Sequence, residues 1–199
     1  MSDVLISAFE PFDGAQENVS RTVLEALPPT LCGFSLAKVT LPVSYASAYP
    51  LLEAALKRHH PALLLMSGLA RKRKTFTLER LAVNLDHATL ADNDGVIRTH
   101  HRIVEDAPDA LFTNLPFERI LDAAARERVS LDLSESAGRY VCNDVFYQAM
   151  LYTQRCDASL KAGFIHLPPS EEAFESTLKR VMTLYRIIIK TTLSQGVSP

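Results

Sequence analysis

Three short, almost wholly apolar segments decide the fold class of this chain. They are residues 3–8 (DVLISA), 62–66 (ALLLM) and 161–167 (KAGFIHL). Runs of this length with few polar interruptions are typical of strands that are buried on both faces of a sheet. Segments with helical periodicity separate these runs along the chain. The order of elements therefore predicts an α/β protein with helices packed on both faces of a sheet.

Amphipathic patterns predict the helices that cover this sheet. Ser20 is expected to cap the first helix, and Pro50 either to lie in the first turn of the second helix or to kink it. Leu51 is expected on the buried stripe of the second helix, and Phe174 on that of the last. The predicted helices cover residues 21–27, 46–59, 117–128, 142–154 and a final segment that opens at Ser170-Glu171-Glu172.

Two further strands and one long loop complete the predicted elements. Residues 34–43 have the composition of a strand. Residues 75–85 (TFTLERLAVNL) are expected to form one strand, with Glu79 and Val83 on the same face by the period of two. The segment 86–115 is poorly periodic and is predicted to be a surface loop.

Composition excludes several classes of protein. The 199 residues are expected to form one domain, residues 1–199, and the formal charge of −2 gives no attraction to nucleic acid or to an anionic membrane. No apolar run approaches the ~18 residues of a membrane span. Three cysteines, an odd number without metal-type spacing, favour a reducing compartment, so a cytoplasmic location is expected. No phosphate-binding glycine loop is present, and no cofactor is expected.

Three residues could carry chemistry together. Cys142 lies where a loop meets a predicted helix, and a helix N-terminus is expected to lower the pKa of its thiol. His166 ends an apolar strand, where α/β sheets place their ligands. Glu79 is a carboxylate on an apolar strand face, which is costly to bury unless it is paired. The three match a nucleophile, a base and an orienting acid. The alternatives are a buried core thiol, a hydrogen-bonded core histidine and a structural ion pair.

Two other features are weaker. The basic run Arg71 to Lys74 lacks interleaved aromatic residues, so a solvated loop is favoured over a nucleic-acid patch. The pair His100-His101 lies near acids, but adjacent side chains face apart in regular structure. No metal site is expected there.

Seven blocks of sequence together resemble the pyroglutamyl peptidase I family, also called pyrrolidone-carboxylate peptidase. They occur in the family's order and cover most of the chain up to about residue 170. One block alone would be modest evidence, but the set is highly specific. The blocks are FEPFDG followed by NVS (residues 9–14 and 18–20), LPV (41–43), SGLA (67–70), ERLAVN (79–84), DNDG (92–95), SAGRYVCN (136–143) and GFIHLP (163–168).

The resemblance implies a three-layer α/β/α sandwich with a mixed central sheet, of the phosphorylase/hydrolase-like kind. It implies a cysteine peptidase that removes an N-terminal pyroglutamyl residue from peptides through a thioester. Its catalytic residues would be Cys142, His166 and Glu79, the same three that the local chemistry indicates. It also implies a homodimer or homotetramer. The implied substrate-binding residues are Phe9, Phe12, Asn18, Leu69, Tyr140 and Val141.

The sequence departs from the family pattern at one position of chemical interest. Thr89 stands where many members carry an arginine, and threonine is neutral and short. We expect Arg71 or Arg73 to supply the missing cation, because the basic run follows directly on the SGLA block. The alternative is an oxyanion site built from backbone donors. At the level of function, the alternative is a catalytically inactive protein that binds pyroglutamyl peptides on the same fold.

Overall fold

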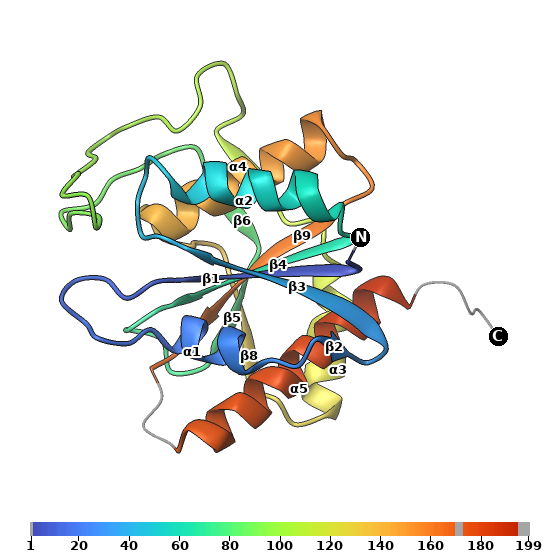
Figure 1. The fold of residues 1–199 in the computed structure, drawn as a ribbon. Coiled ribbons are helices and arrows are strands. Elements are labelled where there is room, and N and C mark those ends of the chain that lie inside the picture. Colours follow the sequence, from blue (N-terminus) through green and yellow to red (C-terminus); the bar gives the residue numbers. More distant parts are fainter. Residues whose placement is uncertain (1, 170–172, 195–199) are drawn as a thin grey trace.

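A mixed sheet forms the centre of the protein (Figure 1). The computed structural model describes residues 2–169 and 173–194. Within that part the sheet has seven strands: Val4–Phe9 (β1), Thr30–Leu31 (β2), Phe34–Leu41 (β3), Leu63–Leu69 (β4), Phe76–Glu79 (β5), Leu131–Ser134 (β8) and Lys161–Leu167 (β9).

The order and direction of the strands place the functional edge. Across the sheet the order is β2-β3-β1-β4-β9-β5-β8. Strands β3, β1, β4 and β9 are mutually parallel, so their carboxyl ends lie at one edge. Strand β5 pairs antiparallel with β9 and parallel with β8, which makes the sheet mixed, as predicted.

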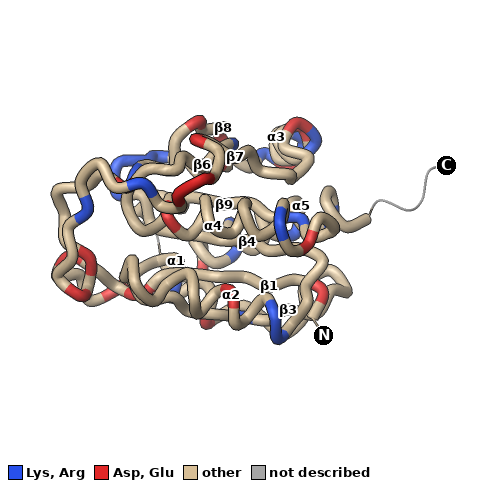
Figure 2. The backbone as a smooth tube through the Cα atoms, turned by 90° about the horizontal axis from the view of Figure 1, so that it is seen from above, with Lys and Arg blue, Asp and Glu red and all other residues tan. Residues whose placement is uncertain are grey.

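Helices cover both faces of the sheet. Ala48–His59 (α2) and Val141–Arg155 (α4) lie on one face, whereas Val19–Ala26 (α1), Phe117–Arg126 (α3) and Phe174–Leu193 (α5) lie on the other (Figure 1). Seen from above, the central strands β1 and β4 carry no charged residue (Figure 2). The predicted three-layer sandwich is confirmed.

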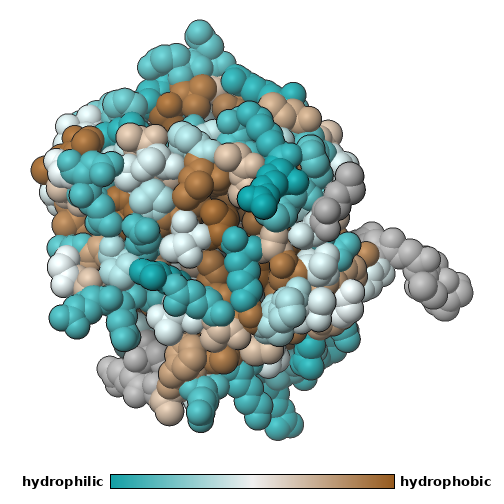
Figure 3. All heavy atoms as spheres, viewed as in Figure 1, coloured by the Kyte–Doolittle hydropathy of each residue, from teal (hydrophilic) through white to brown (hydrophobic). Residues whose placement is uncertain are grey.

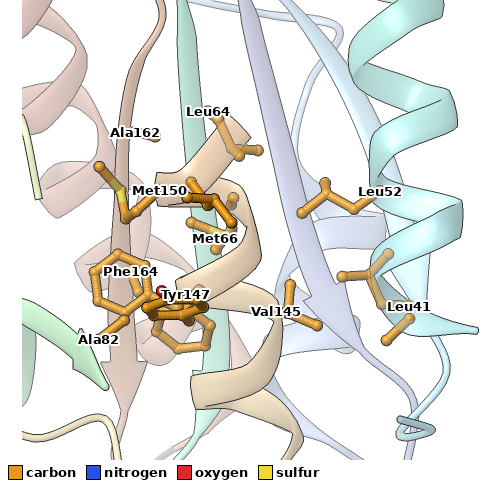
Figure 4. Close-up of a cluster of buried hydrophobic side chains, with 14 of the residues drawn as sticks. Leu41, Leu52, Leu64, Met66, Ala82, Val145, Tyr147, Met150, Ala162 and Phe164 are labelled. Atoms are coloured by element: carbon orange, nitrogen blue, oxygen red, sulfur yellow. The ribbon is translucent and has the colours of Figure 1, made fainter. Parts of the chain in front are cut away.

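Each side of the sheet has its own hydrophobic core. Figure 4 shows part of the core between the sheet and helices α2 and α4, where Tyr147 and Met150 of α4 meet Met66 of β4 and Phe164 of β9. Tyr147 and Phe164 are fully buried. Each large side chain buried in this way contributes roughly 1.5–3 kcal/mol. A second core holds α1, α3 and α5 against the opposite face.

Three details of the predicted helices are wrong. The N-cap of α1 is Asn18, whose side-chain oxygen accepts a hydrogen bond from the backbone N–H of Ser20. Leu51 is 42% exposed and Phe174 is 41% exposed, so neither lies on a buried stripe. Leu51 points outward because the core-facing positions of α2 are Ala48, Leu52 and Leu56. The predicted opening of the last helix at residues 170–172 lies outside the described residues.

The strand predicted over residues 75–85 is two strands. It breaks at Arg80, whose N–H donates to the carbonyl of Ser134 and whose carbonyl accepts from Thr113. After the break, Leu81–Val83 (β6) pairs with Ala110–Phe112 (β7) in a separate small sheet. Glu79 and Val83 therefore do not share a face, because the chain changes sheets between them.

The segment 86–115 is more ordered than a surface loop. It contains β7 and an isolated bridge between Asp86 and His101. Asp86 is fully buried and Asp92 is 5% exposed. Asp92 is held by several backbone donors, among them the N–H groups of Tyr45 and Val96.

The surface drawn in Figure 3 is mostly hydrophilic, with a smaller apolar area near its middle. The run Ile187–Ile189 of α5 adds nothing to the surface, because all three side chains are buried. No helix in the described ranges is both long and apolar enough to cross a membrane.

Candidate active site

A cavity of about 350 Å³ opens at the carboxyl edge of the parallel strands. Its lining comes from the ends of β1, β4 and β9, from the loops that follow β1 and β4, and from the start of α4. Carboxyl edges of this kind are where α/β sheets bind their ligands. The described lining residues are Phe9, Phe12, Asn18, Val43, Leu69, Ala70, Arg73, Ser136, Ala137, Gly138, Tyr140, Val141, Cys142 and His166.

Glu79 and His166 form a buried hydrogen-bonded pair at this cavity. Glu79 ends β5 and is fully buried, and His166 on β9 is 6% exposed. The Nδ1 atom of His166 lies 2.7 Å from Oε1 of Glu79. An ionised carboxylate accepts here, so Nδ1 carries the proton and donates it. The other ring nitrogen, Nε2, is thereby left as an acceptor that can take a proton.

Cys142 lines the same cavity from the second position of α4. The thiol lies against Gly68 of β4, where a Cβ atom would come within 3.0 Å of its Sγ. Burial, together with the charge of Glu79, raises the pKa of the Cys142 thiol to about 12. The direction is opposite to the lowering of the thiol pKa that the helix position predicts, because burial penalises the charged thiolate. The thiol needs a base to take its proton, and His166 faces the same cavity.

The start of α4 supplies hydrogen-bond donors next to the thiol. The first N–H groups of a helix have no acceptor within it. Val141 and Cys142 are the first two residues of α4, and Tyr140 is its N-cap. Such N–H groups favour a negative charge that develops beside them.

Aromatic side chains form part of the apolar wall. Phe12 and Tyr140 lie 6.1 Å apart between ring centroids, and Phe9 packs 6.4 Å from Phe164. Burial raises the pKa of Tyr140 to about 12, so its hydroxyl stays a neutral donor, and it donates to the carbonyl of Ala91. A neutral, mostly apolar wall excludes an ammonium group through its desolvation cost and admits an uncharged ring.

Asn18 fixes the first loop of the site. Its Nδ2 donates to the carbonyl of Glu10, and its Oδ1 accepts from both the backbone N–H and the hydroxyl of Ser20. The structure therefore brings all nine residues singled out in the sequence to the same place. Eight line the cavity, and Glu79 lies behind His166.

Of the two arginines expected near the site, Arg73 lines the cavity. Its guanidinium donates to Ser134 Oγ and lies 3.6 Å from Oε1 of Glu79. Arg71 instead pairs with Asp13 and lies over the ring of Phe12. The neighbouring Arg71, Lys72 and Lys74 are exposed, as expected of a solvated loop, whereas Arg73 is half-buried. Its contact with Glu79 is what distinguishes Arg73 from Arg71.

Comparisons with known proteins agree with one another. A family model described as pyroglutamyl peptidase matches residues 2–191. A pyrrolidone-carboxylate peptidase of Thermococcus onnurineus is 36% identical over 196 residues, which is 96% of this chain and 98% of the relative. The crystal structure of pyroglutamyl peptidase I from Bacillus amyloliquefaciens superposes with a TM-score of 0.89 at 29% identity, covering 96% of this chain and 94% of that one. The pyrrolidone carboxyl peptidase from Thermococcus litoralis gives 0.88 at 28% identity, over the same shares of the two chains.

Proposed function

This chain belongs to the pyroglutamyl peptidase family, and we propose that it is a cysteine peptidase that removes the N-terminal pyroglutamyl residue from peptides. One observation from the structure carries the proposal. An imidazole held by a buried carboxylate and a cysteine thiol at a helix N-terminus border one small, largely apolar cavity. This combination suits acyl transfer from an uncharged ring amide.

We assign the chemical steps to three side chains. His166 Nε2 takes the Cys142 proton, and Sγ attacks the carbonyl carbon that joins pyroglutamate to the next residue. The tetrahedral intermediate collapses as the C–N bond breaks, and the imidazolium gives its proton to the leaving amine. Water, deprotonated by the same imidazole, then hydrolyses the thioester. Glu79 holds the Nδ1–H tautomer and stabilises the imidazolium in both halves of the reaction.

We assign recognition of the lactam to the aromatic wall. Phe9, Phe12, Tyr140 and Val141 would enclose the ring, with backbone groups of Leu69 available to its amide. An ordinary peptide N-terminus is an ammonium and would lose its hydration in such a pocket without gaining a charged partner. Asn18 would act by holding the loop that carries Phe12.

We assign Arg73 to a role beside Glu79 of the Glu79–His166 pair, and not to stabilisation of the oxyanion. Among the described residues its charged partner is Glu79, and it also donates to Ser134 Oγ and to the carbonyl of Ser136. A guanidinium in that position helps to hold the carboxylate that orients His166. The oxyanion is then left to the backbone N–H groups at the start of α4.

The proposal extends to the setting of the enzyme. We propose one pyroglutamyl-peptidase-like domain over residues 1–199, in the cytoplasm, which the three free cysteines support. A homodimer or homotetramer is part of the proposal. Exposed apolar side chains such as Phe112 and Ile97, 56% and 55% exposed, are available for such contacts. Light scattering of the purified protein at several concentrations tests the assembly.

The experiment that tests the activity is cleavage of a pyroglutamyl–fluorophore amide, with and without prior thiol alkylation. Release of the fluorophore that alkylation abolishes supports the proposal. A protein that binds pyroglutamyl peptides without cleaving them would be the inactive alternative. A protein that cleaves a free-amine alanyl amide as fast as the pyroglutamyl amide would contradict the assigned specificity.

A further inference from the structure

A buried cluster with more acid than base lies behind the candidate pocket. Arg98 Nη1 lies 2.8 Å from Oδ2 of Asp86 and 3.2 Å from Oδ2 of Asp144. Both carboxyl groups are almost completely buried, at 0% and 1% exposed, and the Arg98 side chain is 23% exposed. Gln148 donates to the remaining oxygen of Asp144, whereas Oδ1 of Asp86 has no hydrogen-bond partner among the described residues.

This cluster is connected to the pocket wall by stacked rings. The guanidinium of Arg98 lies 4.4 Å from the centroid of the Tyr45 ring. Tyr45 meets Tyr140 edge to face at 5.7 Å, and Tyr140 in turn packs 6.1 Å from Phe12. Tyr140 and Phe12 line the cavity, but Tyr45 and Arg98 do not. Arg98 therefore stands two side chains away from any bound ring.

The same cluster ties the long loop to the catalytic helix. Asp86 and Arg98 belong to the segment that follows β6, and Asp144 is two residues after Cys142 on α4. The neighbouring Asn143 reinforces this junction, because its side chain pairs with the backbone of Val83.

We propose that Arg98 is a positioning residue for the lactam pocket: anchored by Asp86 and Asp144, it supports Tyr45 and so holds Tyr140 in the wall against which the substrate ring packs. This inference rests on the proposed function of the site. It concerns substrate binding, not the chemical step, because neither Arg98 nor Tyr45 reaches the cavity.

Charge balance requires one proton within the cluster. Two buried carboxylates against one guanidinium would leave a net negative charge without solvent, which is costly. Asp144 is the better holder of the proton: burial, followed by the charge of Asp86, raises the pKa of Asp144 to about 7. Asp86 keeps the shorter contact to the guanidinium.

The other groups near this cluster leave that assignment unchanged. Burial raises the pKa of Tyr45 far above neutrality, and the nearby Asp86, Tyr140 and Asp144 raise it further while Arg98 lowers it. Tyr45 therefore stays uncharged. His101 pairs with Asp86 through backbone hydrogen bonds, so this contact adds no charge to the cluster.

The first experiment separates binding from chemistry. Arg98→Gln should raise the KM for a pyroglutamyl amide, and the inhibition constant of 2-pyrrolidone, by about tenfold, while kcat changes less than about threefold. Arg98→Lys should recover part of the loss, since it keeps the charge but not the flat stacking surface. The matched control is Arg102→Gln, which breaks an exposed pair with Asp109 on the same segment. It should leave both constants unchanged.

The second experiment tests the shared proton. Wild-type KM should rise as pH increases through about 7 to 8, when Asp144 ionises. Asp144→Asn copies the neutral acid, so its KM should match wild type at pH 6 and stay flat to pH 9. Asp86→Asn leaves Arg98 with Asp144 as its one carboxylate partner in the cluster. KM should then be raised already at pH 6, and it should no longer increase between pH 7 and 8.

Several outcomes would overturn the inference. One is an Arg98→Gln enzyme with unchanged KM, or one in which kcat falls as much as kcat/KM. Another is an Asp144→Asn enzyme that keeps the alkaline rise in KM. If Asp86→Asn does not fold, the Arg98 and Asp144 variants still decide the question. Failure of the proposed function is distinguishable, because wild type would then turn over no pyroglutamyl amide at any pH.

Discussion

Gly68 lies directly opposite His166 in the parallel pairing of β4 with β9, and the Cys142 thiol rests against it. A Cβ atom at position 68 would come within 3.0 Å of Sγ of Cys142 and 3.1 Å of the Phe164 ring. Because Gly68 has no side chain, there is room for Cys142 of α4 beside the strand pair that carries His166.

Gly68→Ala should keep the fold and lower kcat by about tenfold or more, because small displacements of a reacting atom are expensive in rate. The matched comparison is Gly163→Ala on β9, where the new Cβ would meet Leu115 at 2.2 Å, away from the cavity lining. That variant should lose about 1–3 kcal/mol of stability instead. Thermal unfolding and steady-state kinetics on both proteins check the contrast, and equal kcat for Gly68→Ala and wild type would contradict it.

Cys142→Ser should abolish measurable turnover while the protein stays folded. A serine hydroxyl is much harder to ionise than a thiol and is a poorer nucleophile beside the same imidazole. Cys32→Ala and Cys156→Ala are the controls and should retain activity. Residual activity above about a tenth of wild type in Cys142→Ser would remove Cys142 from the role of nucleophile. Loss of activity in either control would point to a different thiol.

Glu79→Gln should lower kcat by about 10² or more, since the amide keeps the size of the side chain but not the charge that stabilises the imidazolium. KM should change much less. The measurement is the pH profile of kcat with an uncharged pyroglutamyl amide, together with a melting curve. A variant within about threefold of wild type would mean that Glu79 is only a structural partner of His166.

Arg73→Gln should lower kcat by about tenfold, because the guanidinium lies 3.6 Å from the Glu79 carboxylate that orients the base. Lys72→Gln, one residue away and exposed, is the control and should be silent. A complex with a pyroglutamyl aldehyde bound to Cys142 distinguishes the two possible roles. A guanidinium of Arg71 or Arg73 within about 3.2 Å of the hemithioacetal oxygen would assign the oxyanion role to that arginine instead.

Asp144→Asn should change the pH dependence of stability with a defined sign. The folded-state pKa of Asp144, about 7, lies above its ordinary value of 3.8. The folded protein therefore binds more protons than the unfolded chain between those values, and this group destabilises the fold as pH rises from about 4 to 7. The difference in Tm between Asp144→Asn and wild type should be small at pH 5 and should favour the variant at pH 8. A difference that is the same at both pH values would show that Asp144 is ionised throughout.

The sequence was sufficient to predict the central strands and the grouping of Cys142, His166 and Glu79. Cys142 begins a helix and His166 ends a parallel strand, and such positions meet at the carboxyl edge of an α/β sheet. Glu79 joins them from the antiparallel strand β5, so its place beside His166 follows from the β5–β9 pairing and not from the edge rule. Continuous apolar runs such as Leu63–Leu69 leave little ambiguity about burial on both faces.

Features that depend on distant partners could not be predicted in this way. The break at Arg80 arises because β5 pairs with β9 and β8, whereas β6 pairs with β7. The alternation of apolar and polar residues over 75–85 does not indicate that the chain changes sheets. The short edge strand β8 was missed because two of its four residues are exposed, so no apolar run marks it.

Charged residues were the hardest to place. Asp86 reads as a loop residue, yet it is fully buried because Arg98, twelve positions later, returns to neutralise it. Arg73 belongs to a basic run that was expected to be solvated or to supply a cation to the oxyanion, yet its partners lie on β5 and at the end of β8. In both cases tertiary contacts set the environment of the side chain, and secondary-structure propensity does not predict such contacts.

The placement of Glu79 and His166 has a consequence for how such a protein can diversify. They are diagonal neighbours across the antiparallel pairing of β5 with β9, where Thr77 faces His166 and Glu79 faces Phe164. Their spacing is thus set by backbone hydrogen bonds between strands, and a one-residue slip would turn the carboxylate to the wrong face. The loops that shape the pocket are not part of that pairing. Insertions or deletions in those loops can therefore alter substrate preference over evolutionary time without changing the Glu79–His166 geometry on which proton transfer depends.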